Sequence, residues 1–446
     1  MNDVINLEKC YEADLDTNIL PLGRAVTVQD EGGEGIAIGT LQGNKMLPRQ
    51  KDIEGLASEL ASIVTDAKSF GAKGDGITDD CIAIQNAIDY CHNKGGGTVL
   101  LSTGIFLCGS VKGSYNALLY ARDNVSIKGT GFNSILKAKA GLNFAGDTGY
   151  FNFLSTELIT DSVSNCIFED FTFDLNGNNN LITNPSDYAK ADNAIKLWNG
   201  GNIIIQNVKS CNNAGLQHFR FGRDDLADFG TVKILNCFVS ESGGSIANNH
   251  QIDHSSIYYI GNDLLIDGCS FNNQNIPSEG GNCAIENHAR HSIISNNKIS
   301  GYTNANIIAP TTADMEQALY IGNSIDNCGQ GFFLWSIEGF DLNDLKIVNN
   351  NVNISSSDGY GLHCLKVISD ISKIEISGNT FRYTGTETTY SGRAISIKRF
   401  KNAIIRNNTI EGYVGGAIEV RPNSLGTSNV IVDGNMVYDC GKKSSL

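Results

Sequence analysis

The amino-acid sequence predicts an all-β fold built as a parallel β-helix, and three observations support that prediction. From about residue 203 onward, short runs of alternating apolar residues recur, each followed by a Gly or Asn turn and one more apolar residue. The alternation has the period of two that is typical of β-strands, and a repeat of 20 to 50 residues indicates a solenoid. The composition agrees, because 49 Gly and only 6 Pro suit many tight turns with positive φ.

Nine copies of this turn pattern define the repeat. Successive copies lie 26 to 33 residues apart, which is about one turn of a β-helix, and the strand-like alternation does not fit leucine-rich or helical repeats. Stacked coils are separated by about 4.8 Å, so equivalent Asn, Cys and Ile side chains are expected to form rows inside the helix. The last apolar residues of the nine copies are Val208, Phe238, Phe271, Ile299, Ile325, Val352, Phe381, Ile410 and Val437.

The charge and hydropathy of the 446 residues exclude several protein classes. Hydrophobic residues make up 41% of the chain, which indicates a folded protein with a core rather than a disordered one. No stretch approaches the length of a membrane span, and the charged opening lacks the apolar segment of a signal peptide, so we expect no membrane insertion and no secretion signal. A net charge of −15 argues against nucleic acid as a partner.

The first 66 residues differ from the repeats and are expected to form two small parts. Residues 22–41, LGRAVTVQDEGGEGIAIGTL, predict a β-hairpin around a Gly-rich turn, within an N-terminal adaptor at residues 1–50. Residues 51–66 are predicted to form a short helical neck, because Ile53, Leu56, Leu60 and Ile63 follow the a/d spacing of a coiled coil. The β-helix domain is then expected to span residues 67–446.

Residues 67–107, AKSFGAKGDGITDDCIAIQNAIDYCHNKGGGTVLLSTGIFL, predict a helix followed at once by a strand. Thr78 is placed to cap the helix, Asp79 and Asp80 favour the positive end of its dipole, and three glycines end it. Such a helix would cover the open end of the solenoid, whose exposed strand edges would otherwise pair with another chain.

This segment resembles the opening of the pectate-lyase-like right-handed β-helix superfamily, with FGAKGDG, TDD, GGG and a short strand in the same order. A small adaptor and neck before a β-helix is also similar to bacteriophage and prophage tailspike depolymerases. The resemblance implies a right-handed, single-stranded parallel β-helix with an N-terminal capping helix, and a depolymerase that cleaves within a bacterial surface polysaccharide, either capsule or O-antigen.

The same resemblance implies a place for the protein. A tailspike is a homotrimer whose N-terminus attaches to a phage tail, baseplate or another tail protein. The protein would then be part of the virion, made in the host cytoplasm and acting at the bacterial cell surface. Tailspikes commonly carry a trimerising domain after the solenoid, whereas this chain stops at VIVDGNMVYDCGKKSSL, so the resemblance bears more strongly on the fold than on the trimer.

A second strand recurs about 13 to 20 residues before most turn copies and predicts an outward face. Alignment of these strands on an inward apolar residue, Ile307 in one of them, places the following residue of each strand outside. This expected outward row contains Lys196, Tyr258, Glu286, Ile308, His363, Ser396 and Glu419. Two residues further along the strands lie Trp198, His288, Trp335, Lys398 and Arg421.

Hydrolysis of a glycosidic bond needs two carboxyl groups, one a proton donor and the other a nucleophile or a base. Glu286 and Asp253 are the leading catalytic pair, and His288 is placed to orient them or to transfer a proton. Solvated surface carboxylates and turn caps would explain both acids without catalysis. Other acids stay open as partners, namely Asp224, Asp225, Asp314, Glu316, Glu338 and Asp341.

Aromatic and polar side chains on the outward face are candidates for sugar binding. Outward rings on a polar solenoid suit the apolar faces of sugars, and the basic FRFGRDD segment, with Arg220 and Arg223, suits an acidic polysaccharide or a solvated loop. The substrate-binding candidates are Tyr258, Trp335, His254, Arg290, Arg220 and Trp198.

Three other functions are open from the sequence. Tyr258, His288 and Arg290 would also serve β-elimination, in which a base removes the proton beside a uronic carboxylate. A noncatalytic spike that binds glycans is the alternative from another functional class, and a uronate epimerase is a further one.

The sequence contains three segments that resemble metal sites. HQIDH and HARHS have metal-ligand spacing but lie on no predicted helix, and GDGITDD suits a helix cap. We therefore expect no metal and no cofactor.

Overall fold

The computed structural model divides the chain into two compact units, Met1–Val64 and Thr65–Leu446. In the first unit it describes the backbone of three strands, and in the second most of the chain. The described ranges beyond the first strands are 63–113, 116–142, 151–180, 193–213, 217–226, 228–240, 254–273, 282–336, 339–356, 359–366, 371–386, 392–421 and 429–441.

The first unit contains the predicted hairpin. Strand β1 (Ala25–Asp30) pairs antiparallel with β2 (Gly33–Thr40), which pairs antiparallel with β3 (Gly43–Met46). The predicted helical neck at residues 51–66 falls mostly outside the described residues. Its last three residues, Val64–Asp66, form strand β4 and not a helix, since β-branched Val64 and Thr65 favour extended backbone.

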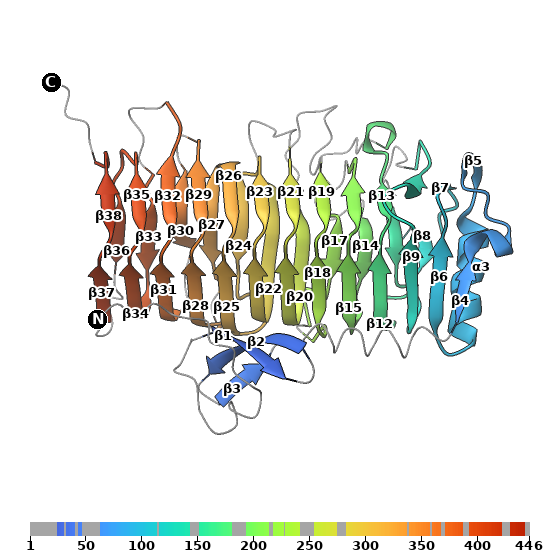
Figure 1. The fold of residues 1–446 in the computed structure, drawn as a ribbon, viewed down its shortest axis with the longest axis horizontal. Helices are drawn as coiled ribbons and strands as arrows, with labels where there is room; N and C mark the ends of the chain where they lie inside the picture. Colours follow the sequence, from blue (N-terminus) through green and yellow to red (C-terminus); the bar gives the residue numbers. More distant parts are fainter. Residues whose placement is uncertain are drawn as a thin grey trace. The chain divides into compact units, whose positions relative to one another are not determined.

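The second unit is a right-handed parallel β-helix, as the repeat and the resemblance predict. Its strands stack in register from rung to rung and form three parallel ladders (Figure 1). Strands β20 (His254–Asp267) and β22 (Asn282–Ser295) each bend through two ladders, so ladders 1 and 2 together with β4 count as one 22-stranded sheet, whereas ladder 3 is a separate 13-stranded sheet.

Ladder 1 carries the outward face of interest. It contains β8 (Ala117–Tyr120), β11 (Asn152–Ser155), β14 (Asn193–Leu197), β17 (Phe219–Phe221), the first halves of β20 (His254–Asp267) and β22 (Asn282–Ser295), β24 (Asn304–Ile308), β27 (Gln330–Trp335), β30 (Tyr360–Lys366), β33 (Ile395–Lys398) and β36 (Ile418–Arg421).

Ladder 2 follows ladder 1 along each coil. It contains β6 (Gly97–Leu101), β9 (Val125–Gly129), β12 (Ser162–Glu169), β15 (Asn199–Gln206), β18 (Val232–Leu235), the second halves of β20 and β22, β25 (Met315–Ile321), β28 (Leu342–Val348), β31 (Ile371–Ser377), β34 (Phe400–Arg406) and β37 (Asn429–Asp433).

Ladder 3 closes each coil after a tight turn. It contains β5 (Asp75–Asp79), β7 (Gly104–Cys108), β10 (Ser134–Ala138), β13 (Thr172–Asp174), β16 (Lys209–Cys211), β19 (Phe238–Ser240), β21 (Ser270–Asn272), β23 (Lys298–Ser300), β26 (Ser324–Cys328), β29 (Asn351–Ile354), β32 (Thr380–Tyr383), β35 (Thr409–Glu411) and β38 (Met436–Tyr438). Two short 3-10 helices, η1 (Ala67–Phe70) and η2 (Gly177–Asn179), lie between strands.

The predicted helix is present as α3 (Cys81–Asn93) and covers the first coil (Figure 1). Its N-cap is Asp80 rather than Thr78, because Thr78 lies in β5, where its N–H donates to the Asp75 carboxylate at 2.8 Å. The Asp79 carboxylate accepts a hydrogen bond from the backbone N–H of Cys81, at 3.1 Å. The aspartates of GDGITDD therefore accept hydrogen bonds from backbone N–H groups at the start of the capping helix, as predicted. Every helix among the described residues is too short or too polar to cross a bilayer.

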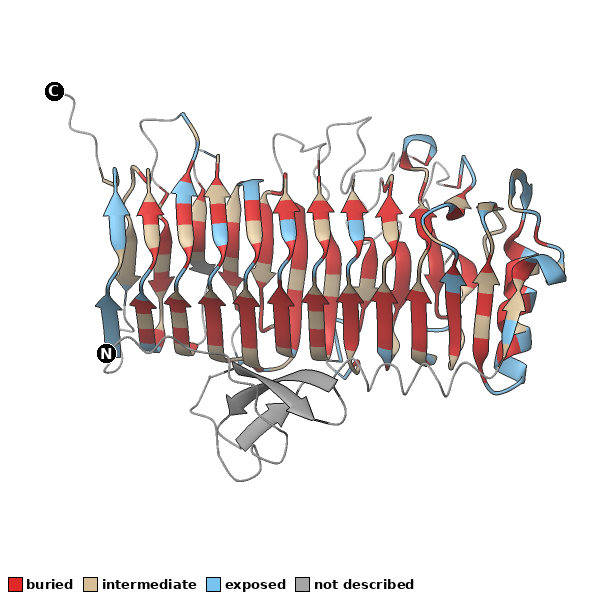
Figure 2. Ribbon diagram, viewed as in Figure 1, coloured by how far each residue is buried: buried red, intermediate tan, exposed pale blue. Residues whose placement is uncertain are grey.

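The core runs along the inside of the coils from the α3 end toward β37 and β38 (Figure 2). Inward side chains such as Phe173, Ile195 and Ile285 are fully buried. At the last coil the equivalent inward residues Val430 and Val432 are 40% and 50% exposed, since no described rung follows them.

An internal asparagine row crosses the turns between ladders 2 and 3. Asn297, Asn323, Asn350, Asn379 and Asn408 each donate a side-chain N–H to the Oδ1 of the next asparagine, at 2.9–3.0 Å. Each acceptor Oδ1 also takes the backbone N–H of the preceding asparagine. An amide side chain has both a hydrogen-bond donor and an acceptor. The same residue type can therefore satisfy the buried polar groups at the turn of each successive rung. This confirms the predicted internal row.

Replacement of Asn350 by leucine tests the contribution of this row to stability. Asn350→Leu keeps the volume close but leaves the Asn323 amides and the Tyr320 carbonyl without their partners. Each buried polar group left unpaired costs about 1–3 kcal/mol, so we expect the free energy of unfolding to fall by about 3 kcal/mol or more. Chemical denaturation monitored by circular dichroism measures the change.

The matched control is the neighbouring Asn351→Leu, because Asn351 is exposed on ladder 3. That change should alter stability by less than about 0.5 kcal/mol. Equal effects of the two substitutions would contradict a stabilising role for the internal row.

Candidate active site

The parallel register of ladder 1 places one residue of each strand in a continuous outward row. Tyr258 is opposite Glu286, and Glu286 is opposite Ile307. The expected Ile308 is wrong for this row, because Ile308 is fully buried and the inward position before Ile307 is taken by the polar Asn306. The outward row consists of Tyr120, Ser155, Lys196, Arg220, Tyr258, Glu286, Ile307, Phe333, His363, Ser396 and Glu419.

Glu286 lies at the middle of the row with both carboxylate oxygens held. The Ser255 hydroxyl donates to Oε2, and His288 Nε2 lies 3.1 Å from Oε1. The Glu286 side chain is 16% exposed. Burial alone would raise the pKa of Glu286, but the contacts with His288 and Ser255 outweigh it and hold the pKa below its usual value. Glu286 is therefore an ionised carboxylate with a small accessible surface.

His288 is fixed from both sides. Its Nδ1 lies 2.7 Å from the Thr311 hydroxyl, and its side chain is only 2% exposed. The neutral tautomer satisfies both contacts, since Thr311 donates to Nδ1 while Nε2–H donates to Glu286. The ring also packs on Tyr258, with centroids 5.0 Å apart. His288 thus sets the position of the Glu286 carboxylate.

A second carboxylate lies one rung further, beyond Tyr258. The Tyr258 hydroxyl donates to Asp224 Oδ1 at 2.9 Å, and Arg220 binds Asp224 Oδ2 at 2.8 Å. Burial, together with the charges of Glu286 and Asp224, raises the pKa of Tyr258. Tyr258 therefore stays protonated, with its hydroxyl on Asp224 and its backbone opposite Glu286 in the ladder.

Basic and aromatic side chains lie next to Tyr258 on the neighbouring rungs of ladder 1. The Arg220 guanidinium lies over the rings of both Tyr258 and Trp198, at 4.7 and 5.4 Å from their centroids. Lys196 Nζ lies 4.5 Å from the centroid of the Trp198 ring. Burial and the nearby Arg220 charge lower the pKa of Lys196 to about 7. The predicted binding residues Tyr258, Arg220 and Trp198 are therefore brought together beside Glu286.

Arg290 and Arg223 are engaged elsewhere in the structure. Arg290 lies at the bend of β22 and forms an ion pair with Glu316 at 2.8 Å, beside His291, which contacts Asp263 at 3.2 Å. Arg223 binds the exposed carboxylate of Asp225 at 2.6 Å. These ion pairs hold Arg290 and Arg223 at carboxylates other than Glu286.

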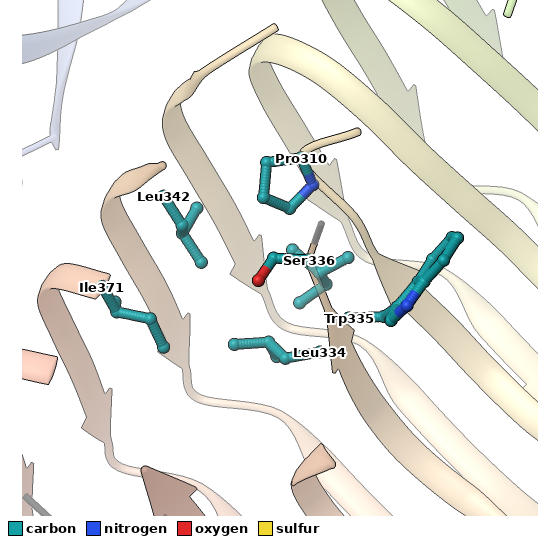
Figure 3. Close-up of a pocket in the computed structure, with 7 residues that line it drawn as sticks. Pro310, Leu334, Trp335, Ser336, Leu342 and Ile371 are labelled. Atoms are coloured by element: carbon teal, nitrogen blue, oxygen red, sulfur yellow. The ribbon is translucent and has the colours of Figure 1, made fainter. Parts of the chain in front are cut away.

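Trp335 lies on the far side of Ile307 from Tyr258, two rungs from Glu286. It borders a narrow apolar crevice, shown in Figure 3, with Pro310, Leu334, Leu342 and other residues. In the close-up the Trp335 ring points away from Leu334 and Ser336, which line the same crevice (Figure 3). Among the described residues no contact joins Trp335 to the Glu286 cluster, although a long ligand on ladder 1 would pass near it.

Two predicted site residues lie partly or wholly outside the described residues, and a further histidine is buried in the core. Asp253 lies outside the described residues, as does the side chain of His254, whose backbone begins β20. His218 is fully buried inside the coil, and its Nδ1 lies 2.6 Å from the Ser210 hydroxyl, so its imidazole belongs to the core.

Three residues that build the site are not among the leading sequence-predicted candidates. Asp224 appeared only among several alternative acids, and Ser255 and Thr311 did not appear as candidates. Asp224 and Thr311 lie outside the strands of ladder 1, and Ser255 lies three positions before Tyr258, where strand alternation alone does not predict an outward contact with Glu286. Only the position of Asp224 close after Arg220 offered a sequence signal.

Comparison with known proteins finds one family model and several relatives. Residues 64–152 match the family model described as "Rhamnogalacturonase A/epimerase, pectate lyase-like". A mannuronan C5-epimerase of Azotobacter vinelandii is 46% identical over 66 residues, which cover 15% of this chain and 8% of that protein. A capsule depolymerase of Klebsiella phage K64-1 is 24% identical over 359 residues, covering 79% of this chain and 38% of that one. The chain thus spans well under half of either relative.

Solved structures share the architecture. A mutant tailspike of E. coli bacteriophage HK620 in complex with a pentasaccharide has a TM-score of 0.64 at 16% identity, covering 90% of this chain and 68% of that chain. The A-module of an Azotobacter vinelandii mannuronan C-5 epimerase has a TM-score of 0.52 at 16% identity, covering 86% and 98%. The second unit therefore has the pectate-lyase-like right-handed parallel β-helix fold found in phage tailspikes.

Proposed function

We propose that this protein is a tailspike-like depolymerase that binds a bacterial surface polysaccharide and cleaves within it by hydrolysis of a glycosidic bond. The observation that carries the proposal is the ionised Glu286 carboxylate, held by Ser255 and His288 on a face lined with Tyr258, Arg220 and Trp198. The sugar-acting relatives and the glycan-bound tailspike with the same fold support a polysaccharide as substrate.

In this mechanism Glu286 acts as the nucleophile or as the base that activates water. A lowered pKa suits either role, whereas a general acid needs a raised one. Asp224 is the second carboxyl group on the described surface, linked to the site through the Tyr258 hydroxyl. Asp253 stays a rival for this role. Trp198 and Tyr258 offer rings for the apolar faces of sugars.

Hydrolysis is favoured over β-elimination by the state of Tyr258. An elimination through Tyr258 as base needs a deprotonated phenol, and burial beside Glu286 and Asp224 raises the pKa of Tyr258. Arg290, the other predicted elimination residue, binds Glu316 away from the cluster. An ionised carboxylate with a second acid on the same face matches the requirements of a glycoside hydrolase better than those of a lyase.

The resemblance to tailspikes also supports a proposal for assembly. We infer a homotrimer that is part of a phage virion, with residues 1–50 attached to the tail and the β-helix presented to the bacterial surface. Sedimentation of the full chain tests this inference, because a monomer at micromolar concentration would contradict the trimer.

Product analysis on purified capsular polysaccharides and O-chains tests the activity. We expect oligosaccharides heavier by one water and without ultraviolet absorbance of an unsaturated uronate. Glu286→Gln should lower the rate at least 10³-fold, because the amide cannot attack or activate water. Asp224→Asn and Asp253→Asn identify the second acid, since only the variant of the true partner should lose activity to a similar extent.

Glu411→Gln is the matched control for these variants. Glu411 makes an exposed ion pair with Arg382 on ladder 3, at 2.7 Å, far from the outward row of ladder 1. This variant should keep full activity. Unsaturated products would overturn hydrolysis, and wild-type protein that binds a glycan without shortening it would overturn the depolymerase.

The pH dependence of the reaction tests the role of His288. Glu286 acts only when ionised, so kcat/KM falls as the pH drops through its pKa. The His288 contact lowers that pKa, and its removal in His288→Ala should raise it. The acid limb of kcat/KM should therefore move to higher pH, in addition to a lower maximum rate.

His291→Ala provides the comparison for this experiment. His291 contacts Asp263 and Glu316 on ladder 2, so its loss should leave the acid limb in place. An acid limb that does not move in His288→Ala would contradict the proposed electrostatic support of Glu286.

A further inference from the structure

A second cluster of side chains lies on the same outward row, beyond the Glu286 site. His363 is three rungs from Glu286, through Ile307 and Phe333, which places it about 14 Å away at the usual strand spacing of about 4.8 Å. Ser396 and Glu419 continue the row on the next two rungs. None of these residues takes part in the chemistry proposed above.

Aromatic rings form the near side of this cluster. Tyr360 stacks on His363 with ring centroids 3.8 Å apart and planes 11° apart. Phe333 meets the same imidazole edge-on, at 6.1 Å and 70°. All three side chains are only partly buried, so the rings form a continuous surface on ladder 1 that solvent reaches. Such a surface suits the C–H face of a pyranose ring.

His363 is an uncharged member of this surface. Burial and the nearby Lys398 charge lower the pKa of His363 to about 4, so the imidazole is neutral at physiological pH. Within the part of the chain that the structure describes, its Nδ1 is buried and has no hydrogen-bond partner. A buried polar atom without a partner is uncommon in proteins, which marks His363 as an unusual member of the cluster.

The far side of the cluster carries an excess of positive charge. Glu419 accepts hydrogen bonds from Ser396 at 2.9 Å and Arg421 at 2.6 Å, and Arg393 lies 3.7 Å from it. Lys398, whose charge acts on His363, is a third cation on this side of the cluster. In a chain with a net charge of −15, such a local excess favours an anionic group beside the rings.

We propose that Phe333, Tyr360 and His363 form a second glycan subsite that binds a sugar residue carrying a carboxylate. The sugar ring packs on the aromatic surface, and the carboxylate faces Arg393 and Lys398. The subsite rests on the proposed function only in taking a polysaccharide as the ligand, and it needs no cleavage. It would hold the polymer several sugar residues away from Glu286.

Nuclear magnetic resonance titration of the histidine ring protons tests this subsite. The protein carries Glu286→Gln, so that no probe is cleaved, and the His363 signal is assigned by its loss in His363→Gln. The probes are tetramers of galacturonate, glucuronate and mannuronate, with cellotetraose as the neutral probe. We expect at least one uronate tetramer to shift the His363 signal and to raise its pKa, because a carboxylate nearby favours the charged imidazole.

Two substitutions separate binding from folding defects. Arg393→Gln should weaken binding of the responding tetramer at least tenfold, because it removes the cation that faces the carboxylate. Arg406→Gln makes the same chemical change on ladder 2, where Arg406 binds Glu375 at 3.0 Å, and should leave binding unchanged. Tyr360→Leu, which keeps the charges, should weaken binding through loss of the ring surface.

The outcomes for this subsite and for the depolymerase are separable. A His363 signal that responds to none of the three uronate tetramers would overturn the subsite even if the wild-type protein cleaves a polysaccharide. An equal response to cellotetraose would overturn the preference for a carboxylate. A uronate response that depends on Arg393, in a protein that cleaves no polysaccharide, would support the subsite and contradict the depolymerase.

Discussion

Hydrogen bonding between parallel strands on successive rungs is the interaction on which the rest of this structure depends. It fixes the spacing between equivalent residues at about 4.8 Å, so every side chain has a partner of the same position above and below. Inside the coil this repetition is a constraint, because a buried polar group at one rung must be satisfied at the next. The asparagine row of Asn297, Asn323 and Asn350 meets the constraint by donating and accepting at every rung.

On the outside of the coil, the same spacing places different residue types next to each other on neighbouring rungs. Together they form a surface whose chemistry changes along the ladder. Tyr258 and Glu286 are 28 residues apart in sequence but directly opposite each other in the ladder. The rungs align these residues, and segments outside the strands add Asp224 and Thr311, which bind Tyr258 and His288. The rigid part of the site therefore comes from the repeat, and its particular contacts come from residues that the repeat does not specify.

This division explains which features the sequence could predict. The period, the internal row and the outward position of Tyr258 and Glu286 follow from alternation and repeat length, and the capping helix follows from the acidic residues at its start and the glycines at its end. Ile308 was misplaced because the alignment assumed an apolar inward residue, whereas the coil holds Asn306 inside, donating to the Gly331 carbonyl at 3.2 Å. The contact of Ser255 with Glu286 depends on side-chain direction near a corner of the coil, which no spacing in the sequence encodes.

The distribution of charge along ladder 1 connects the two sites. A chain with a net charge of −15 repels an anionic polymer over most of its surface, yet Lys196 and Arg220 lie on one side of Glu286, and Arg393 and Lys398 on the other. Between them the row presents Ile307 and Phe333, which carry no charge. Cations on both sides of this stretch would thus bind an acidic polysaccharide and offset its repulsion by the ionised Glu286. The glycosidic bond would then be held in a fixed position next to Glu286.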